Sequence, residues 1–297
     1  MKILKRIGLI LVGLIGILAI VVAVLHFVGS SRLANAPEVA ASPVTIPTDA
    51  ESLAWGEHLA QAVIPCAECH GANFEGTVFI DEAPIGYVTA PNLTAGAGGV
   101  GSTYTDADWE RAIRHGVGGD GRSLAIMPSN HFATMNDEDL GALIAYLKSV
   151  PPVDNELGER DIIFPGTIIF GVLGYNTLPV ARIDHANMGT VKPAEGVTTA
   201  YGEYLVNIGA CRECHADNLA GNTDPNGSPL GPNLTPGGEL RAWAEEDFMR
   251  IFREGTKPTG TAVNDEMPWR SYGNMTDAEL QAIWLYLQST AALPDNQ

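Results

Sequence analysis

Positive charge and cysteine are both scarce in this chain. Its 297 residues contain 17 Lys and Arg against 35 Asp and Glu, for a formal net charge of −18, and only 4 cysteines. A surface this acidic repels the phosphate backbone, so nucleic acid is excluded as an expected partner. The same charge fits electrostatic steering towards a basic docking face, and it fits equally the plain solubility of an exported protein.

All of the cysteines lie in one motif that occurs twice. Residues 66–70 read Cys-Ala-Glu-Cys-His and residues 211–215 read Cys-Arg-Glu-Cys-His. Cys-x-x-Cys-His is the attachment signature of c-type haem, in which both thiols bond to the haem vinyl groups and the histidine ligates iron. We therefore predict two covalently bound haem c groups. Their attachment residues are Cys66, Cys69 and His70 for one haem and Cys211, Cys214 and His215 for the other.

Three other uses of these cysteines fit less well. A zinc site would need further Cys or His at paired spacing. A thioredoxin-like pair would not call for histidine directly after the second cysteine in both copies. A disulfide framework would have to draw on the same cysteines, because the chain has no others.

The N-terminus joins basic residues to a long apolar run. Three of the first six residues are Lys or Arg, and no Asp, Glu, Lys or Arg interrupts Ile7–Val28. This run is long enough to cross a bilayer as one helix, with the basic end left in the cytoplasm. We predict a membrane anchor over residues 1–30. The alternative is a cleaved signal peptide, because Ala34-Asn35-Ala36 looks like a small-residue cleavage site.

Beyond the anchor the chain contains one domain twice. Such ordered correspondence indicates an internal repeat. We predict a tether over 31–50, a first domain over 51–152, a connector over 153–198 and a second domain over 199–297. The repeat is carried by segments 55–59 and 201–205, 91–94 and 232–235, 127–128 and 267–268, and 137–147 and 277–287.

Helical patterning predicts an all-α fold. In the first domain helices are expected over 53–63, 105–115 and 137–150, with Pro151-Pro152 ending the last one. The second domain is expected to end with the matching helix 277–289. The tether has an alternative as a segment packed along the domain surface.

The connector contains an apolar stretch, residues 162–180, that proline and glycine interrupt. It is too broken to be expected as a second membrane span. We predict that it packs against the two domains, and the alternative is a docking strip for a membrane partner.

Each domain offers two methionines at matching positions, and helix capping separates them. Met135 precedes Asn136 and Met275 precedes Thr276, each at the start of a predicted helix. A hydrophobic residue before an N-cap forms a staple with a residue one turn into the helix. Met135 and Met275 are therefore expected to have structural roles.

The other two methionines lie in loops and are followed by proline, which stiffens the backbone. A thioether is the soft ligand expected opposite histidine in an electron carrier. We predict Met127 as the iron ligand opposite His70, and Met267 opposite His215.

His115 and His131 are rival ligands in the first domain. Neither has a histidine counterpart in the second domain, where Glu254 aligns with His115 and Tyr272 aligns approximately with His131. Both are expected to be surface or structural residues.

A proximal histidine usually donates its other ring hydrogen to a carbonyl or carboxylate. The repeated Pro-Asn-Leu-Thr segments make the carbonyls of Pro91 and Pro232 the candidates. Arginines on the helices are candidate partners of haem propionates or, alternatively, solvated charges. They are Arg111, Arg114, Arg250 and Arg253.

These features resemble the class I cytochrome c family. The shared pattern is a first helix with Gly56 or Gly202, the Cys-x-x-Cys-His motif, a Pro-Asn-Leu segment, a Met-Pro loop and a last helix with Tyr-Leu. More narrowly, stretches 108–116, 137–140 and 201–206 resemble the multihaem cytochrome c subunits of periplasmic alcohol and gluconate dehydrogenases. The resemblance implies small helical domains, His/Met-ligated haem attached on the periplasmic side, and electron transfer. Those subunits typically carry three haems, whereas two motifs are present here.

We therefore expect a membrane-anchored dihaem cytochrome c in a bacterial inner membrane. It would pass single electrons between redox partners on the periplasmic side, as a subunit of or next to a respiratory or dehydrogenase complex. No flavin or quinone motif is recognisable, so substrate oxidation is expected in another subunit. The alternative is a haem enzyme, such as a dihaem peroxidase or a sulfur-compound dehydrogenase, which needs an open iron position. The two Met-Pro loops argue against that alternative.

Overall fold

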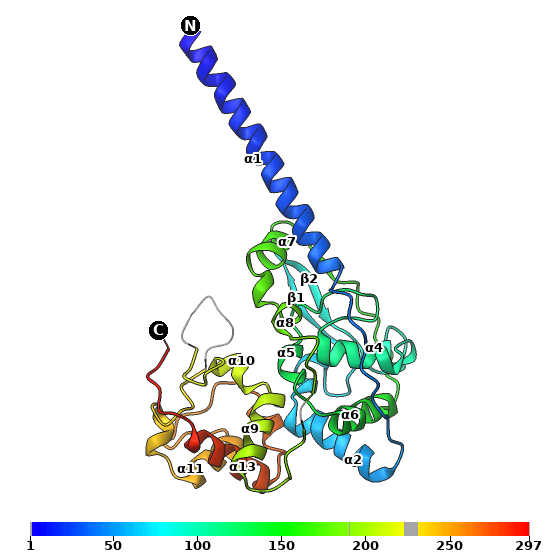
Figure 1. Ribbon diagram of the computed structural model, residues 1–297, viewed down its shortest axis with the longest axis vertical. Helices are drawn as coiled ribbons and strands as arrows, with labels where there is room; N and C mark the ends of the chain where they lie inside the picture. The colour runs from blue at the N-terminus through cyan, green and yellow to red at the C-terminus, as the bar shows by residue number, and fades with distance from the viewer. Residues whose placement is uncertain (1, 190, 223–230, 297) are drawn as a thin grey trace.

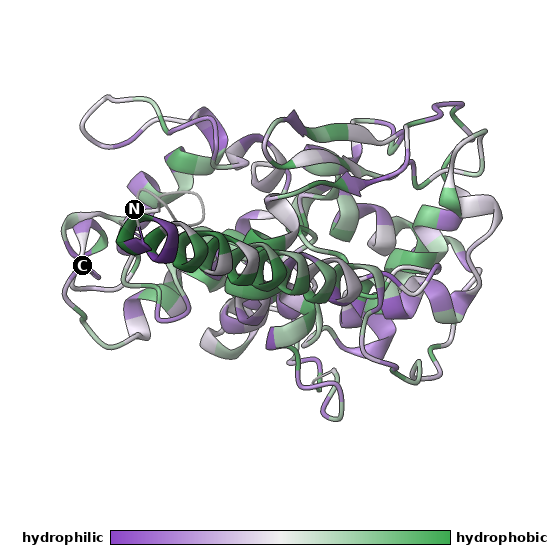
Figure 2. Ribbon diagram, turned by 90° about the horizontal axis from the view of Figure 1, so that it is seen from above, coloured by the Kyte–Doolittle hydropathy of each residue, from purple (hydrophilic) through white to green (hydrophobic). Residues whose placement is uncertain are grey.

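The structure is a computed structural model that describes residues 2–189, 191–222 and 231–296. Helix α1 (Lys2–Ala34) projects from the body of the molecule (Figure 1). It is hydrophobic along nearly its whole length (Figure 2). Among the described residues it is the one helix that is long and apolar enough to cross a membrane, although a signal sequence meets the same criterion.

The first domain is organised around the crossing of its first and last helices. A Cβ at Gly56 would lie 2.0 Å from Ala142 O, so only glycine lets these helices approach this closely. Asn136 caps the last helix by accepting a hydrogen bond from Asp139 N–H. The helical elements are α2 (Ala50–His58), η1 (Leu59–Val63), α3 (Cys66–His70), η2 (Val100–Ser102), α4 (Asp106–Glu110), η3 (Arg111–His115), α5 (Ser129–Phe132) and α6 (Asp137–Ser149).

The second domain repeats this arrangement. A Cβ at Gly202 would lie 1.9 Å from Ala282 O, which matches the crossing in the first domain. Thr276 and Glu279 form a capping box at the start of the last helix. The elements are α9 (Thr199–Ile208), α10 (Cys211–His215), η6 (Glu239–Ala242), α11 (Glu245–Glu254), α12 (Trp269–Tyr272) and α13 (Asp277–Ser289).

The prediction of an all-α fold needs a correction, because a small antiparallel sheet is present. Strands β1 (Thr77–Glu82) and β2 (Gly86–Ala90) form a hairpin, and β3 (Asp161–Ile162) adds to it from the connector in the order β1-β2-β3. The hairpin sequence is rich in Thr, Val, Ile, Phe and Tyr on both sides of a short turn, which is a strand signal.

The connector packs against the first domain and against α1. Besides β3 it contains short helical turns that lie beside the end of α1 (Figure 1). The tether also lies on the first domain, where Val44 and Ile46 pack against its core, in agreement with the surface-packed alternative. The connector's turns are α7 (Gly166–Ile168), η4 (Ile169–Leu173), η5 (Tyr175–Thr177) and α8 (Pro179–Arg182).

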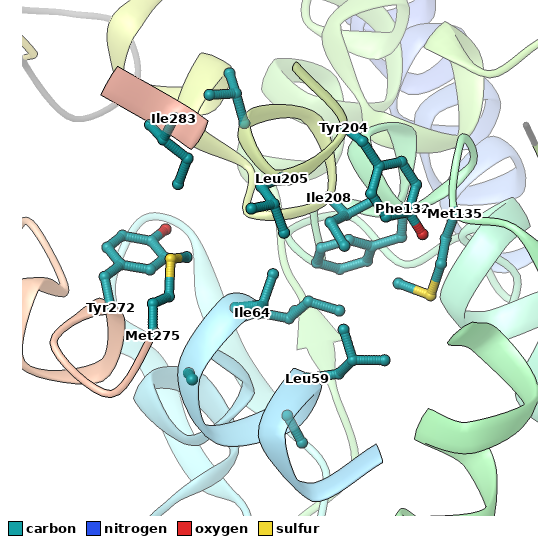
Figure 3. Packing of buried hydrophobic residues seen from close by; sticks show 14 of the residues in the cluster. Leu59, Ile64, Phe132, Met135, Tyr204, Leu205, Ile208, Tyr272, Met275 and Ile283 are labelled. Atoms are coloured by element: carbon teal, nitrogen blue, oxygen red, sulfur yellow. The ribbon is translucent and has the colours of Figure 1, made fainter. Parts of the chain in front are cut away.

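One hydrophobic cluster runs through both domains. Figure 3 shows Leu59 and Ile64 of the first domain beneath Leu205 of the second. Met135 and Met275 are buried in the same cluster, as expected for residues that precede helix caps. The two domains therefore share a continuous core.

Candidate haem sites

The histidine of each motif is held by a backbone carbonyl. His70 Nδ1 lies 2.8 Å from Pro91 O, and His215 Nδ1 lies 2.7 Å from Pro232 O. Both rings are buried, and burial lowers the pKa of each imidazole although the carbonyl raises it. A neutral ring that donates from Nδ1 presents its Nε2 lone pair, which is the form that ligates a metal.

The cysteines lie on two short helical turns, α3 and α10. None of the four forms a disulfide, and all four are partly buried. Burial raises the pKa of Cys66 to about 12 and that of Cys211 to about 12. Redox-active Cys-x-x-Cys pairs have lowered thiol pKa values, so these environments argue against thioredoxin-like chemistry.

The two Met-Pro loops have the same local conformation. Pro128 and Pro268 have ψ near 51°, and the next residue of each loop donates its N–H to the methionine carbonyl at 2.7 Å. Met127 and Met267 are partly buried against the shared cluster, which the first cysteine of each motif also borders. The structure thus fixes both methionine backbones at the edge of the core that carries the motifs.

Further side chains fit a bound haem rather than a closed metal cage. In the described parts of the chain, no group of three or more His, Cys, Asp or Glu is placed to hold a metal ion. Trp109 Nε1 is buried and has no acceptor among those residues, so it is available to a polar group of a cofactor. Phe248 occupies the matching position of the second domain.

The helical arginines have partners within the protein. Arg114 donates to the carbonyl of Met135, and Arg253 donates to the carbonyl of Met275. Each arginine therefore braces the start of the last helix of its domain. This positions the helix start rather than a propionate. The carboxylate partners are Asp108 for Arg111, Asp137 for Arg114, Asp247 for Arg250 and Asp277 for Arg253.

The rival histidines are engaged elsewhere. His115 Nδ1 lies 2.8 Å from His185 Nδ1 of the connector, inside a buried group that includes Glu110. His131 Nε2 lies 2.9 Å from Glu213 of the second domain. Counting along α5 and α12 from the Met-Pro loops, Ser271 matches His131, which corrects the approximate alignment with Tyr272.

Each haem motif also touches the other domain. Glu213 of the second motif meets His131, which lies four residues after Met127. In the equivalent contact of the other domain, Glu68 of the first motif accepts a hydrogen bond from Ser271 Oγ at 2.7 Å, four residues after Met267. No local sequence signal predicts these contacts, although both motifs carry Glu at the same position.

A second pair of contacts obeys the same symmetry. Tyr204 on α9 donates to Asp139 Oδ2 at 2.5 Å, and His58 on α2 lies 2.9 Å from both carboxylate oxygens of Glu279. Tyr204 matches His58 in the repeat, and Asp139 matches Glu279. The domains therefore face each other about an approximate two-fold axis, with α5 against α9 and α12 against η1.

Each of the two domains combines a Cys-x-x-Cys-His motif, a carbonyl partner for its histidine and a Met-Pro loop. This combination is typical of cytochrome c domains arranged in tandem. Residues 55–151 match the family described as Cytochrome c, and residues 198–287 match the family described as Cytochrome C oxidase, cbb3-type, subunit III. The chain thus contains two cytochrome c domains, as the sequence resemblance implied.

Three relatives show the range of proteins that this chain is similar to. It is 29% identical over 274 residues to the gluconate 2-dehydrogenase cytochrome c subunit of Pantoea cypripedii, covering 82% of this chain and 60% of that protein. It is 30% identical over 263 residues to the cytochrome c subunit of the quinone alcohol dehydrogenase of Gluconacetobacter polyoxogenes, covering 78% and 54%. It is 26% identical over 252 residues to the diheme cytochrome c-type of Cereibacter sphaeroides, covering 77% and 82%. The chain thus spans only part of the two dehydrogenase subunits.

Proposed function

We propose that this chain is a membrane-anchored dihaem cytochrome c that carries single electrons between redox partners outside the cytoplasm. The observation that carries the proposal is the position of both Cys-x-x-Cys-His turns at one interface, where each touches the other domain through its glutamate. An electron entering at either site then has the second site next to it. We take the domains as 51–152 and 199–297, with the connector between them.

The chain's own residues have distinct tasks in this function. Haem iron, when bound, takes up and releases one electron. Cys66 and Cys69 would hold the first haem covalently, while His70 and Met127 would ligate its iron. The carbonyl of Pro91 fixes the ring orientation and tautomer of His70.

The second domain supplies the same set. Cys211 and Cys214 would hold the second haem covalently, while His215 and Met267 would ligate its iron. Pro232 fixes His215 as Pro91 fixes His70. Equivalent ligand sets favour electron exchange between the sites over catalysis at one of them.

The packing of α1 supports its retention as an anchor. Gly29 and Leu33 are buried, and a Cβ at Gly29 would lie 2.1 Å from Thr167 O of the connector. His26 Nδ1 lies 2.7 Å from Thr167 Oγ1. A leader that is cut off after Ala36 would have no need of such a close fit to the mature protein.

The basic start of α1 supports an orientation with both domains on the periplasmic side of a bacterial inner membrane. The names of the relatives support a place in, or next to, a membrane dehydrogenase or respiratory complex. We do not propose a haem enzyme, because His131, the histidine nearest in sequence to Met127, is committed to Glu213.

Haem counting tests the core of the proposal. The purified chain is expected to carry two haems, and the double substitution Cys66→Ala/Cys69→Ala is expected to leave about half of the haem absorbance. The double substitution Cys211→Ala/Cys214→Ala should do the same. Full haem content in either variant would refute covalent attachment at that motif.

Optical spectra of the oxidised protein test the methionines. Met127→Ala and Met267→Ala are each expected to remove about half of the weak far-red sulfur-to-iron band. Met275→Leu, which alters a buried methionine beside a cap, serves as the matched control and should keep the band. If Met127→Ala or Met267→Ala left the band intact, that haem would have another ligand or an open site.

A further inference from the structure

Four apolar side chains project from the connector beside α1. Their exposed fractions are high for such residues, at 40%, 52%, 43% and 78% in chain order. The surrounding stretch, residues 162–181, contains no Asp, Glu, Lys, Arg or His. We call this surface the connector patch. Its members are Ile163, Phe164, Ile169 and Leu173.

The connector patch is held rigidly against α1. Gly171 and Gly29 lie so close that a Cβ on Gly171 would be 2.3 Å from Gly29 O. His26 Nδ1 lies 2.7 Å from Thr167 Oγ1, and Arg32 donates to Gly171 O at 3.4 Å. Turns α7 and η4 therefore lie level with the last two turns of α1 (Figure 1).

The length of α1 sets the height of this contact relative to a bilayer. A hydrocarbon core of about 30 Å takes about 20 helical residues at a rise of about 1.5 Å each. Counting from Ile7, the first residue after the basic start, such a span ends at His26. The contacts of His26 with Thr167 and of Gly29 with Gly171 thus lie at the outer boundary of the hydrocarbon.

We propose that the connector patch inserts into the outer leaflet of the membrane, next to the point where α1 leaves it. The inference rests on the proposed role of α1 as a retained anchor. Exposed apolar side chains at the lipid boundary gain free energy by leaving water, as in membrane proteins that lie in the interface. Lipid is present at this height whether or not another protein is bound, which favours a lipid occupant over a protein.

Insertion of the patch would give the protein two membrane contacts instead of one. A single helix followed by a flexible chain would let the domains tumble above the bilayer. With α7 and η4 also inserted, the first domain keeps a fixed face towards the membrane. The haem motifs would then stay at a constant height and angle relative to membrane partners.

Fluorescence quenching by lipid tests this on the full chain in nanodiscs made of phosphatidylcholine alone. Three variants, Leu18→Cys, Leu173→Cys and Leu285→Cys, are labelled with a thiol-reactive fluorophore. Emission is compared with and without nitroxide-labelled lipid. Leu18 lies within α1, and Leu285 is an exposed leucine of the second domain that serves as the matched control. The unsubstituted chain, labelled in parallel, reports any free native cysteine.

Leu173→Cys is expected to be quenched at least about twofold, close to Leu18→Cys, while Leu285→Cys stays unquenched. Quenching of Leu18→Cys without quenching of Leu173→Cys would overturn the patch proposal and leave the anchor standing; the patch would then be a surface for a protein. Failure at Leu18→Cys would instead refute the anchor. Strong labelling of the unsubstituted chain would refute the thioether bonds without touching the patch.

Discussion

The two domains are built on one plan but differ in how much is added to it. The histidine and its carbonyl partner are 21 residues apart in the first domain and 17 apart in the second. The longer segment of the first domain forms the β1-β2 hairpin, and the connector completes the sheet with β3. The first domain is thereby joined to the part of the chain that packs on α1. In the proposed orientation the first domain lies next to the membrane, whereas the described residues of the second domain contain no strand.

The interiors differ in the same direction. Glu110, His115 and the connector's His185 form a buried polar group in the first domain. The matching residues of the second domain are Met249 and Glu254, so the group has no counterpart there. Buried charges cost free energy unless they are paired, so the first domain depends more on intact ion pairs than the second does.

Removing the bracing arginine from each domain should show this difference most strongly. Arg114 is 1% exposed and faces the buried Glu110, so Arg114→Ala should lower the free energy of unfolding by about 3–5 kcal/mol. Arg253 is 33% exposed, and Arg253→Ala should cost about 1 kcal/mol. Urea titration of both variants measures the difference, with Arg270→Ala, at an exposed ion pair, as a surface control. Equal losses would contradict the view that the two interiors differ.

Substitution of the glycines at the two helix crossings should instead lower the stability of both domains equally. Gly56→Ala and Gly202→Ala each force a Cβ against a backbone carbonyl about 2 Å away, so each should cost about 1–3 kcal/mol. Gly13→Ala is the control, because a Cβ there meets nothing within 4 Å. Thermal unfolding of the three variants provides the comparison, and a large difference between Gly56→Ala and Gly202→Ala would break the equivalence of the crossings.

The interface contacts sharpen the comparison at a smaller scale. Tyr204→Phe removes the hydroxyl that Asp139 needs in a fully buried place, so it should cost about 1–3 kcal/mol. His58→Gln keeps a donor for Glu279 at a partly exposed place and should cost less, about 1 kcal/mol or below. Urea titration again measures both. A larger loss for His58→Gln than for Tyr204→Phe would show that the contact of His58 with Glu279 is the stronger of the two.

Acid should weaken the same interface gradually. Burial raises the pKa of Glu279, but hydrogen bonds from His58 and Thr276 outweigh it and hold the pKa below its usual value of 4.5. A carboxyl with a lowered folded-state pKa stabilises the fold above its unfolded pKa, and that contribution is lost as the pH falls through the folded value. Stability measured between about pH 3 and pH 7 should therefore fall at the acid end, and by less in His58→Gln. The same slope in both proteins would exclude His58 as a cause.

Local sequence signals predicted much of this structure. The paired Cys-x-x-Cys-His motifs, the caps at Asn136 and Thr276 and the matching Gly56 and Gly202 depend on short spacings, so they could be read directly. The hairpin between the motif and Pro91 was not predicted, because the family resemblance implies helical domains, although the β-branched residues of this segment favour strands.

The domain interface could not be predicted from such local signals. Tyr204 and Asp139 are ordinary residues 65 positions apart, and no periodicity connects them. The role of the connector was predicted only in outline for the same reason, since its fit to α1 depends on the close approach of Gly29 and Gly171. Pairing between distant segments is decided by packing, which a single sequence does not display.

The approximate two-fold axis between the domains gives the chain the geometry of an isologous dimer whose subunits are joined by the connector. In such a dimer a given surface is complementary to a copy of itself. Two first domains would place His58 against Asp139, and two second domains would place Tyr204 against Glu279, each a donor facing a carboxylate. Each domain thus carries both halves of the contact, one donor and one carboxylate, and the connector holds the two complementary surfaces within one chain.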